Sequence, residues 1–179
     1  MTEKLFRMAQ PTRIGAYARM NISTPSLELR LQTKSEVLLE YNRMSPEDKK
    51  QVAPEWLARV ESSQDSDPWV LGFKIVLRRD GTEVGKCGFT GPPDANGIVE
   101  IAYCVEEKFR GRGYATEAAR GLSAYASADV RVRVIRAHTL PTENASTHIL
   151  RKCGFTRVGE SVDHAAGIVW RWEKAVQPA

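Results

Sequence analysis

The sequence contains few of the residues that bind metals or form covalent cross-links. Among its 179 residues there are three cysteines and three histidines. Cys87, Cys104 and Cys153 are far apart and odd in number, and none belongs to a Cys-x-x-Cys or Cys/His spacing typical of a metal site. This pattern indicates reduced thiols and no metal centre. We expect Cys104 and Cys153 to be small buried hydrophobic side chains.

Long hydrophobic runs are also missing. No stretch approaches the ~20 apolar residues of a membrane span, and the N-terminus lacks the apolar centre of a signal peptide. We therefore expect a cytoplasmic protein with no membrane partner. The net charge of +4 and pI near 9.0 favour acidic partners such as phosphorylated cofactors. A direct nucleic-acid partner is not expected, because the chain lacks the basic and aromatic surface pattern of such proteins.

The length and composition predict one compact domain. Apolar residues make up 42% and charged residues 27%, an ordinary balance for a globular domain. Residues 1–20 show no sustained period, and we expect a loosely attached arm there, with Met20 as an alternative start. The domain is expected over residues 21–175. There are no internal repeats and no interdomain linker.

Hydrophobic periodicity predicts a mixed α/β domain. Leu27–Leu31 alternates apolar and polar residues as a strand does. Ser45 and Pro46 are typical of a helix start, and Asp80-Gly81 is typical of a hairpin turn. The order β-α-α-β-β-β-α-β-α-β-β indicates a mixed sheet with helices on both faces. Strands are predicted over 27–31, 69–78, 83–90, 98–105, 131–138, 155–162 and 167–174, and helices over 34–42, 46–62 (broken near Pro54), 116–126 and 145–152.

A glycine-rich turn joins the strand over 98–105 to the helix over 116–126. It reads Arg110-Gly111-Arg112-Gly113-Tyr114-Ala115-Thr116. Backbone amides in such a turn, together with the helix dipole, form a binding site for an anion. The turn therefore predicts a phosphorylated ligand.

Two common phosphate-binding patterns do not fit this turn. A P-loop needs a Lys-Ser/Thr pair after a correctly spaced glycine, and none follows here. A dinucleotide fingerprint needs glycine or alanine in its last place, which Thr116 occupies, and it belongs to an N-terminal βαβ unit.

A third pattern does fit, because residues 110–115 resemble the Q/R-x-x-G-x-G/A signature of the GNAT (Gcn5-related) acetyltransferases. The matching positions are Arg110, Gly113 and Ala115. The resemblance extends in order and spacing from about Leu27 to Trp172, and it is nearest to the RimJ/RimL-like branch. Its further segments are residues 100–105, 114–118, 137–141, 144–146 and 152–155.

The resemblance implies a single-domain GNAT fold, with a mostly antiparallel sheet that splays between its fourth and fifth strands. It also implies acetyl-CoA as the acetyl donor. The glycine turn would hold the pyrophosphate, the end of the fourth strand would pair with the pantetheine arm, and an amide near Val105 would polarise the thioester carbonyl. The cofactor-binding residues so implied are Tyr103, Cys104, Val105, Arg110, Gly111, Arg112, Gly113, Tyr114, Ala115, Thr116 and Asn144.

Glu100 is the candidate general base. It lies in an apolar strand on the same face as Ala102 and Cys104. A carboxylate there is costly unless it is paired or its pKa is raised, and a raised pKa suits a base that deprotonates an amine near neutrality. Its position also matches the acidic residue common in this family's fourth strand. The alternative is a structural glutamate paired with an arginine or capping a loop. In many members of this family the base acts through ordered water, which is a second route open to Glu100.

The general acid is less defined. Several GNAT branches place a tyrosine where this chain has Leu150, so that assignment fails here. Ser146 is the remaining candidate, unless the thiolate leaves as an anion or takes a proton from solvent. Asn144 has helix N-capping as its alternative role. We expect His138, at a strand end, to be a structural hydrogen-bonding residue.

These features predict an acetyl-CoA-dependent N-acetyltransferase that transfers directly to a primary amine in a ternary complex. The acceptor is a protein N-terminal α-amine or a small-molecule amine, and the protein is a monomer or homodimer. The alternative is a GNAT-fold protein that binds acyl-CoA as a sensor or scaffold without catalysis.

Overall fold

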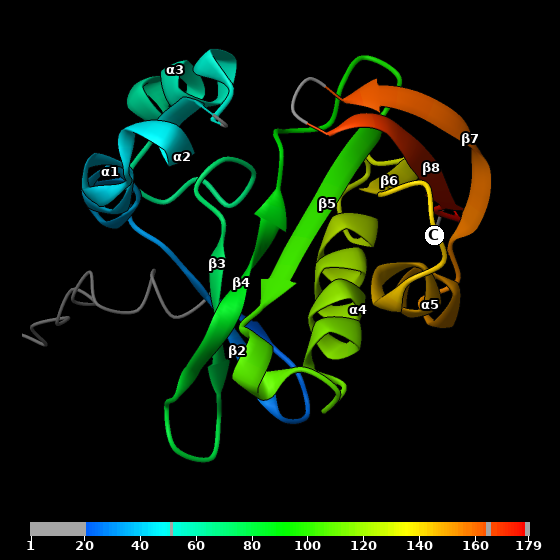
Figure 1. The fold of residues 1–179 in the computed structure, drawn as a ribbon, viewed down its shortest axis with the longest axis horizontal. Coiled ribbons are helices and arrows are strands. Elements are labelled where there is room, and N and C mark those ends of the chain that lie inside the picture. The colour runs from blue at the N-terminus through cyan, green and yellow to red at the C-terminus, as the bar shows by residue number, and fades with distance from the viewer. Residues whose placement is uncertain (1–20, 51, 164–165, 178–179) are drawn as a thin grey trace, which may run out of the picture.

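An eight-stranded sheet lies at the centre of the computed structural model, which describes residues 21–50, 52–163 and 166–177 (Figure 1). The expected arm over residues 1–20 and the alternative start at Met20 lie outside these residues. The strand order is β1-β2-β3-β4-β5-β6-β8-β7. The strands are β1 (Ile22–Ser23), β2 (Leu27–Leu31), β3 (Phe73–Leu77), β4 (Glu83–Phe89), β5 (Ile98–Val105), β6 (Val134–Thr139), β7 (Thr156–Asp163) and β8 (Gly167–Ala175).

The sheet opens between β5 and β6. Every other neighbouring pair of strands is antiparallel, whereas β5 and β6 are parallel. Their pairing covers only three residues of each strand, from Ile98–Val134 to Glu100–Arg136. Beyond Glu100, this edge of β5 has no partner strand in the described part of the chain. The predicted splay between the strands over 98–105 and 131–138 is therefore confirmed.

Helices cover both faces of the sheet, as predicted. They are α1 (Lys34–Arg43), α2 (Pro46–Lys50), α3 (Pro54–Ser62), α4 (Tyr114–Ser127) and α5 (Ala145–Lys152), with a 3-10 turn η3 (Glu107–Phe109). Val99, Ile101 and Val105 of β5 are buried on the face that α4 covers. Ala102 and Cys104 point to the other face, toward the α2 and α3 region.

The helices begin where the sequence supplies caps. Thr33 and Glu36 form a reciprocal capping box at α1. The Ser45 hydroxyl accepts a hydrogen bond from the Asp48 amide at 3.1 Å. Pro54 occupies the first turn of α3. The predicted helix start at Ser45 and the break near Pro54 are both confirmed.

Two predicted strands begin later than expected, at Phe73 and Val134. In each case an aspartate forms a turn just before the strand. The Asp67 carboxylate accepts a hydrogen bond from the Trp69 amide at 2.9 Å. The Asp129 carboxylate accepts one from the Arg131 amide, also at 2.9 Å. These local hydrogen bonds replace the strand pairing that the apolar residues alone predicted.

Smaller differences lie at the glycine turn and near the start of the domain. Helix α4 begins at Tyr114, two residues before the predicted Thr116. The two-residue β1 and the three-residue η3 were not predicted. Both are shorter than the window over which a hydrophobic period can be recognised.

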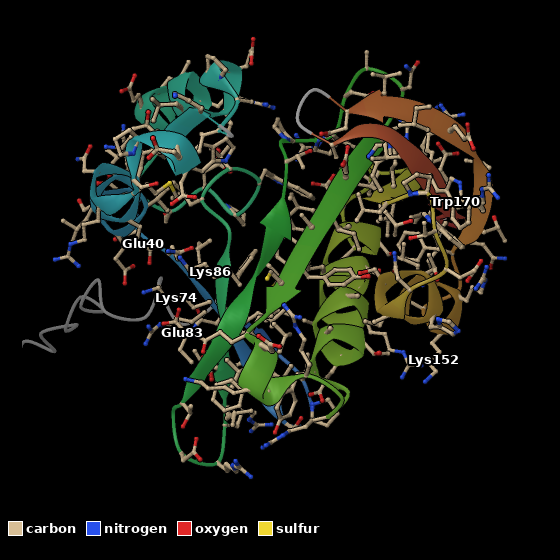
Figure 2. The ribbon with its side chains drawn as sticks, in the orientation of Figure 1. Glu40, Lys74, Glu83, Lys86, Lys152 and Trp170 are labelled. Atoms are coloured by element: carbon tan, nitrogen blue, oxygen red, sulfur yellow. The ribbon has the colours of Figure 1, made fainter. Side chains whose placement is uncertain are left out.

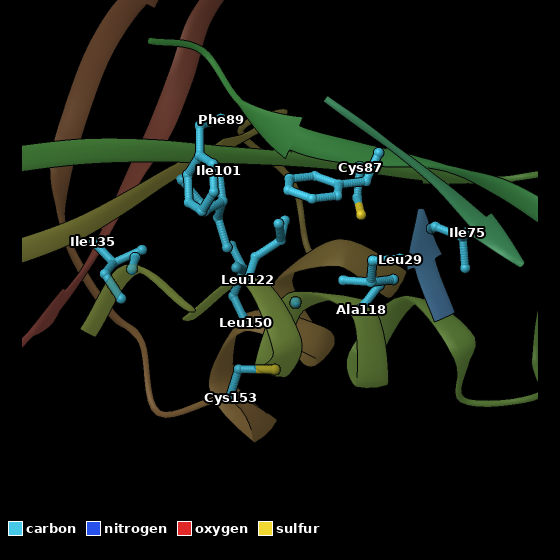
Figure 3. Close-up of a cluster of buried hydrophobic side chains, with 14 of the residues drawn as sticks. Leu29, Ile75, Cys87, Phe89, Ile101, Ala118, Leu122, Ile135, Leu150 and Cys153 are labelled. Carbon is cyan, nitrogen blue, oxygen red and sulfur yellow. The ribbon is translucent and has the colours of Figure 1, made fainter. Parts of the chain in front are cut away.

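One hydrophobic core lies between the sheet and helices α4 and α5 (Figure 3). Leu29 and Ile135 from the sheet, Leu122 from α4 and Leu150 from α5 are all fully buried. A smaller cluster joins α1 and α3 to residues 70–71, with Val37, Val60, Val70 and Leu71 as its buried members. Within the described ranges, no helix has the length and apolar character needed to cross a bilayer.

Candidate active site

The glycine turn adopts a backbone that only glycine accepts easily. Gly111 and Gly113 have φ angles of +74° and +83°, in the left-handed region. A Cβ added to either glycine would meet no described atom within 4 Å. Glycine is therefore required at both positions for its backbone conformation and not for lack of space. The space beside both residues is open to a ligand.

Unpaired amides point out of this turn. The first hydrogen bond at the start of α4 runs from the Glu117 amide to the Gly113 carbonyl, at 3.0 Å. The amides of Gly113, Tyr114, Ala115 and Thr116 have no backbone partner among the described residues. Free amides at a helix N-terminus are suited to an anion, because the helix dipole adds to their attraction.

The two arginines of the turn have different positions. Arg110 folds back, and its Nε donates to the Val105 carbonyl at 3.1 Å. Arg112 lies on the surface, with its guanidinium 5.9 Å from the centre of the Phe109 ring. Arg110 thus ties the turn to the end of β5, while Arg112 lies against η3, where its Nη2 donates to the Lys108 carbonyl at 3.5 Å.

A cavity of about 750 Å³ begins at the glycine turn. It lies between the 21–25 segment and α4, and Gly113 and Thr116 form one end. Arg120 and Lys152 also line it, and Arg120 Nη2 donates to the Lys152 carbonyl at 3.1 Å. Figure 2 shows Lys152 at the end of α5. Arg120 and Lys152 bring two positive charges to this cavity, and Glu117 brings one negative charge.

Glu117 fixes the wall of this cavity. Its carboxylate accepts hydrogen bonds from the Thr24 hydroxyl at 2.6 Å, from the Ser26 amide at 2.7 Å and from the Leu27 amide at 3.1 Å. Burial alone would raise the pKa of Glu117, but the hydrogen bonds from Ser26 and Thr24 outweigh it and lower the pKa. The charged carboxylate therefore holds α4 against the turn before β2.

The unpaired edge of β5 presents backbone groups to the opening. The Glu100 carbonyl accepts a hydrogen bond from the Thr90 amide, and the Glu106 amide donates one to the Val84 carbonyl. The backbone groups of Glu100 and Glu106 therefore point toward β4. Because backbone groups alternate sides along a strand, Ile101, Tyr103 and Val105 point theirs toward the opening. The amide of Val105 therefore faces the space between β5 and β6.

The side chains of this segment differ in exposure. Tyr103 is half-buried against the core, and burial raises the pKa of its phenol, which stays protonated at neutral pH. Cys153 is buried, as predicted, and burial raises the pKa of its thiol. Cys104 is exposed, so the prediction that it is buried was wrong. It lies on the face of β5 turned away from α4, opposite Lys86.

Glu100 is paired with a histidine. His138 Nδ1 lies 2.8 Å from Glu100 Oε1, and both side chains keep partial solvent access, at 23% and 32%. His138 Nε2 is buried and has no hydrogen-bond partner among the described residues. His138 is therefore a hydrogen-bonding residue, as expected, and its partner is the candidate base. The alternative role considered for Glu100 was pairing with an arginine; its partner here is a histidine. Only the register of β5 on β6 could have revealed this contact.

Asn144 and Ser146 lie at the start of α5. Asn144 Oδ1 accepts from the Thr147 amide at 3.1 Å, and the Asn144 amide donates to Thr147 Oγ1 at 3.1 Å. This reciprocal cap occupies the Asn144 oxygen and leaves its side-chain NH2 without a hydrogen-bond partner among the described residues. Ser146 is half-buried in the first turn of α5, and its hydroxyl also makes no hydrogen bond to a described residue. Roles for both in cofactor chemistry stay predictions.

A second cavity, of about 600 Å³, lies on the face of the sheet opposite α4. Ala102 and Cys104 of β5 form part of its floor, and Thr90 lines it directly opposite Glu100, whose carbonyl accepts from the Thr90 amide at 3.0 Å. Glu100 thus lies next to the cavity, on the same face of the sheet. The remaining lining residues are Met44, Val52, Ala53, Trp56, Arg59, Val70, Leu71, Gly72, Lys86, Cys87, Gly88, Phe89 and Tyr103.

A network of charges flanks this cavity (Figure 2). Lys86 Nζ lies 2.6 Å from Glu40 Oε2. Lys74 Nζ lies 3.4 Å from Glu40 and 3.6 Å from Glu83. The hydrogen bonds from Lys86 and Gln32 outweigh the effect of burial on Glu40 and lower the pKa of its carboxyl. The Glu40 carboxylate on α1 therefore neutralises the charge of Lys86, the lysine that lines the cavity.

Comparison with known proteins gives a consistent result. Residues 23–156 match the domain described as "Acetyltransferase (GNAT) domain". The N-acetyltransferase YjdG of Bacillus subtilis, described as uncharacterized, is 32% identical over 111 residues. That alignment covers 62% of this chain and 63% of YjdG, less than two thirds of either.

Solved structures share the fold. RimL, a ribosomal L7/L12 α-N-protein acetyltransferase in complex with coenzyme A, superposes with a TM-score of 0.63 at 15% identity. The match covers 87% of this chain and 98% of that one. The aminoglycoside acetyltransferase AAC(6′)-Ib in complex with coenzyme A superposes with a TM-score of 0.57 at 19% identity, covering 84% and 95% of the two chains. At such identities the likeness establishes the fold alone.

Proposed function

Because this chain belongs to the GNAT acetyltransferase family, whose acetyl donor is acetyl-CoA, we propose that it is a cytoplasmic, acetyl-CoA-dependent N-acetyltransferase. It transfers the acetyl group directly to a primary amine within a ternary complex. One observation carries the proposal: Glu100 with its partner His138, the unpaired edge of β5 and the amide-rich turn follow one another in order from β5 to the start of α4.

The donor is held by the backbone. The amides from Gly113 to Thr116 bind the pyrophosphate, and Arg112 adds positive charge at the mouth of the turn. Arg120 and Lys152 are available to a further phosphate in the adjoining cavity. Tyr103 offers its backbone groups to the pantetheine amides, as a neighbouring strand would. The Val105 amide is the donor for the oxyanion of the tetrahedral intermediate.

Glu100 acts on the acceptor. An ammonium cannot attack a thioester, so Glu100 takes its proton, directly or through water, while His138 holds the carboxylate in place. The neutral amine then attacks the thioester carbonyl, and the new C–N bond forms. As the C–S bond breaks, the nitrogen loses its second proton and the CoA thiolate gains one, either relayed through the Ser146 hydroxyl, which ends protonated, or exchanged with solvent.

The acceptor is a protein N-terminal α-amine or a small-molecule amine. The likeness to RimL, whose description names an α-N-protein acetyltransferase, supports the first. The 600 Å³ cavity beside Glu100 supports either, since it can hold a small molecule or the first residues of a peptide.

Two measurements test the proposal. Calorimetric titration with CoA should give saturable binding, and release of the CoA thiol from acetyl-CoA should depend on an added amine from a panel of peptides, amino acids and polyamines. Absence of CoA binding would contradict the proposal. Binding without thiol release for any amine would instead indicate a non-catalytic acyl-CoA-binding protein.

A further inference from the structure

The described walls of the second cavity carry no negative charge. Among the described residues that line it there is neither aspartate nor glutamate. Most of the surface is apolar, with Met44, Val52 and Trp56 on the side of α1–α3 and Val70 and Leu71 beside them. Such a wall accommodates an apolar side chain and lacks the acidic groups that a polycationic amine would need.

Two cations reach the cavity, and only one of them is neutralised. Lys86 is paired with Glu40 at 2.6 Å. Arg59, on α3, has no carboxylate partner among the described residues, and its Nε donates only to the Glu55 carbonyl, at 3.2 Å. Arg59 therefore presents an uncompensated guanidinium to this cavity.

The position of Arg59 relates it to the candidate base. A Cβ added to Gly91 would lie 2.5 Å from Arg59 Nη1, so the guanidinium lies directly over Gly91. Gly91 follows Thr90, the residue paired across the strands with Glu100. The guanidinium and the Glu100 carboxylate thus lie toward the same end of the cavity. An acceptor whose amine and carboxylate lie close together can place its amine at Glu100 and its carboxylate at the Arg59 guanidinium.

We propose that the acceptor is an α-amine that carries a nearby carboxylate and an apolar side chain, and that Arg59 binds the carboxylate. This inference rests on the proposed acetyltransferase function. The carboxylate comes from a free apolar amino acid or from an acidic second residue of a peptide. Arg59 selects the acceptor and lies apart from the CoA site.

Matched acceptors test the assignment and separate the two sources. Methionine is compared with methioninamide, and a Met-Asp peptide amide with the Met-Asn peptide amide, by kcat/KM for CoA thiol release. In at least one pair the carboxylate form should be preferred tenfold or more, and Arg59→Gln should abolish that preference. Equal rates within both pairs, a higher rate with spermidine, or a preference that survives Arg59→Gln would overturn the proposal.

Two controls keep this result interpretable. Arg79→Gln removes an exposed arginine of the β3–β4 hairpin, paired with Asp80, and should leave the preference unchanged. CoA binding by Arg59→Gln should equal that of the wild type.

Calorimetric binding of N-acetylmethionine to the CoA complex gives a readout without turnover. If N-acetylmethionine binds in an Arg59-dependent way, the assignment of Arg59 is supported, even if no amine is acetylated. The lack of acetylation would then contradict only the proposed transferase function. Binding that ignores Arg59 would contradict the assignment.

Discussion

Glu100 occupies a position in which its neighbours determine its chemistry. The core lies behind it, on the face of Val99 and Ile101, while its own face carries His138 and the cavity beyond Thr90. A carboxylate held by one imidazole and still one-third exposed can exchange a proton with an acceptor that arrives from the cavity.

We predict that Glu100→Gln lowers kcat by about 10²–10⁴-fold, because the amide cannot accept the proton of the acceptor. KM for acetyl-CoA should stay unchanged, since Glu100 lies on β5, apart from the turn that we propose binds the pyrophosphate. Steady-state thiol release from pH 6 to 10 measures both values, with Glu160→Gln on β7 as a matched control. Wild-type kcat across the whole pH range would refute the role of Glu100.

Gly113 permits a second prediction at the same scale. In Gly113→Ala the left-handed backbone should cost about 1–2 kcal/mol of stability, and the added methyl group projects into the open side of the turn. CoA affinity should fall at least tenfold by calorimetry. Gly81→Ala is the matched control, because Gly81 has φ +73° and equally open surroundings in a distant hairpin. It should lose similar stability and keep CoA affinity; equal CoA affinity in both variants would contradict the assigned turn.

At the scale of elements, local chemistry decides where helices and turns begin. The capping boxes at Thr33–Glu36 and Asn144–Thr147 involve residues three apart, so the sequence alone marks them. The strands at Phe73 and Val134 were predicted to start too early, because apolar residues beside Asp67 and Asp129 resemble strand residues. There, side-chain hydrogen bonds favour a turn.

The contact of α4 with the segment before β2 should depend on pH. Glu117 has a lowered pKa in the folded protein, so its contribution to stability is fully present above the unfolded value near 4.5 and is lost as pH falls through the folded pKa. Glu117→Gln should therefore reduce the free energy of unfolding by about 1 kcal/mol at pH 7. Urea denaturation at pH 7 and pH 3 checks this; an equal loss at both pH values would show that the charge is not responsible.

At the scale of the whole molecule, one core joins the two halves of the sheet that diverge at β5 and β6. Leu122 of α4 and Leu150 of α5 pack in the same cluster as residues of β2 and β6. Because this core bridges the opening, the two strands can separate at one end without splitting the domain. The opening is thus a stable feature of the folded protein.

Truncation of this core should destabilise the entire domain. Leu122→Ala removes a fully buried side chain and should lower the free energy of unfolding by about 2–5 kcal/mol. Leu39→Ala, at a position 49% exposed on α1, should change it by less than about 0.5 kcal/mol. Urea denaturation followed by tryptophan fluorescence compares the two. Similar losses in both variants would contradict the assigned core.

The sequence by itself determined the fold class, most of the elements and the glycine turn, because periodicity, caps and positive-φ glycines are properties of neighbouring residues. It also marked Glu100, since a carboxylate in an apolar strand is visible without a structure. Only the tertiary structure decided that His138 is the partner of Glu100, that Cys104 is exposed and that Arg59 lies over Gly91. Each of these depends on strand register or on the packing of α3 against the sheet, and both join residues that are distant in the chain.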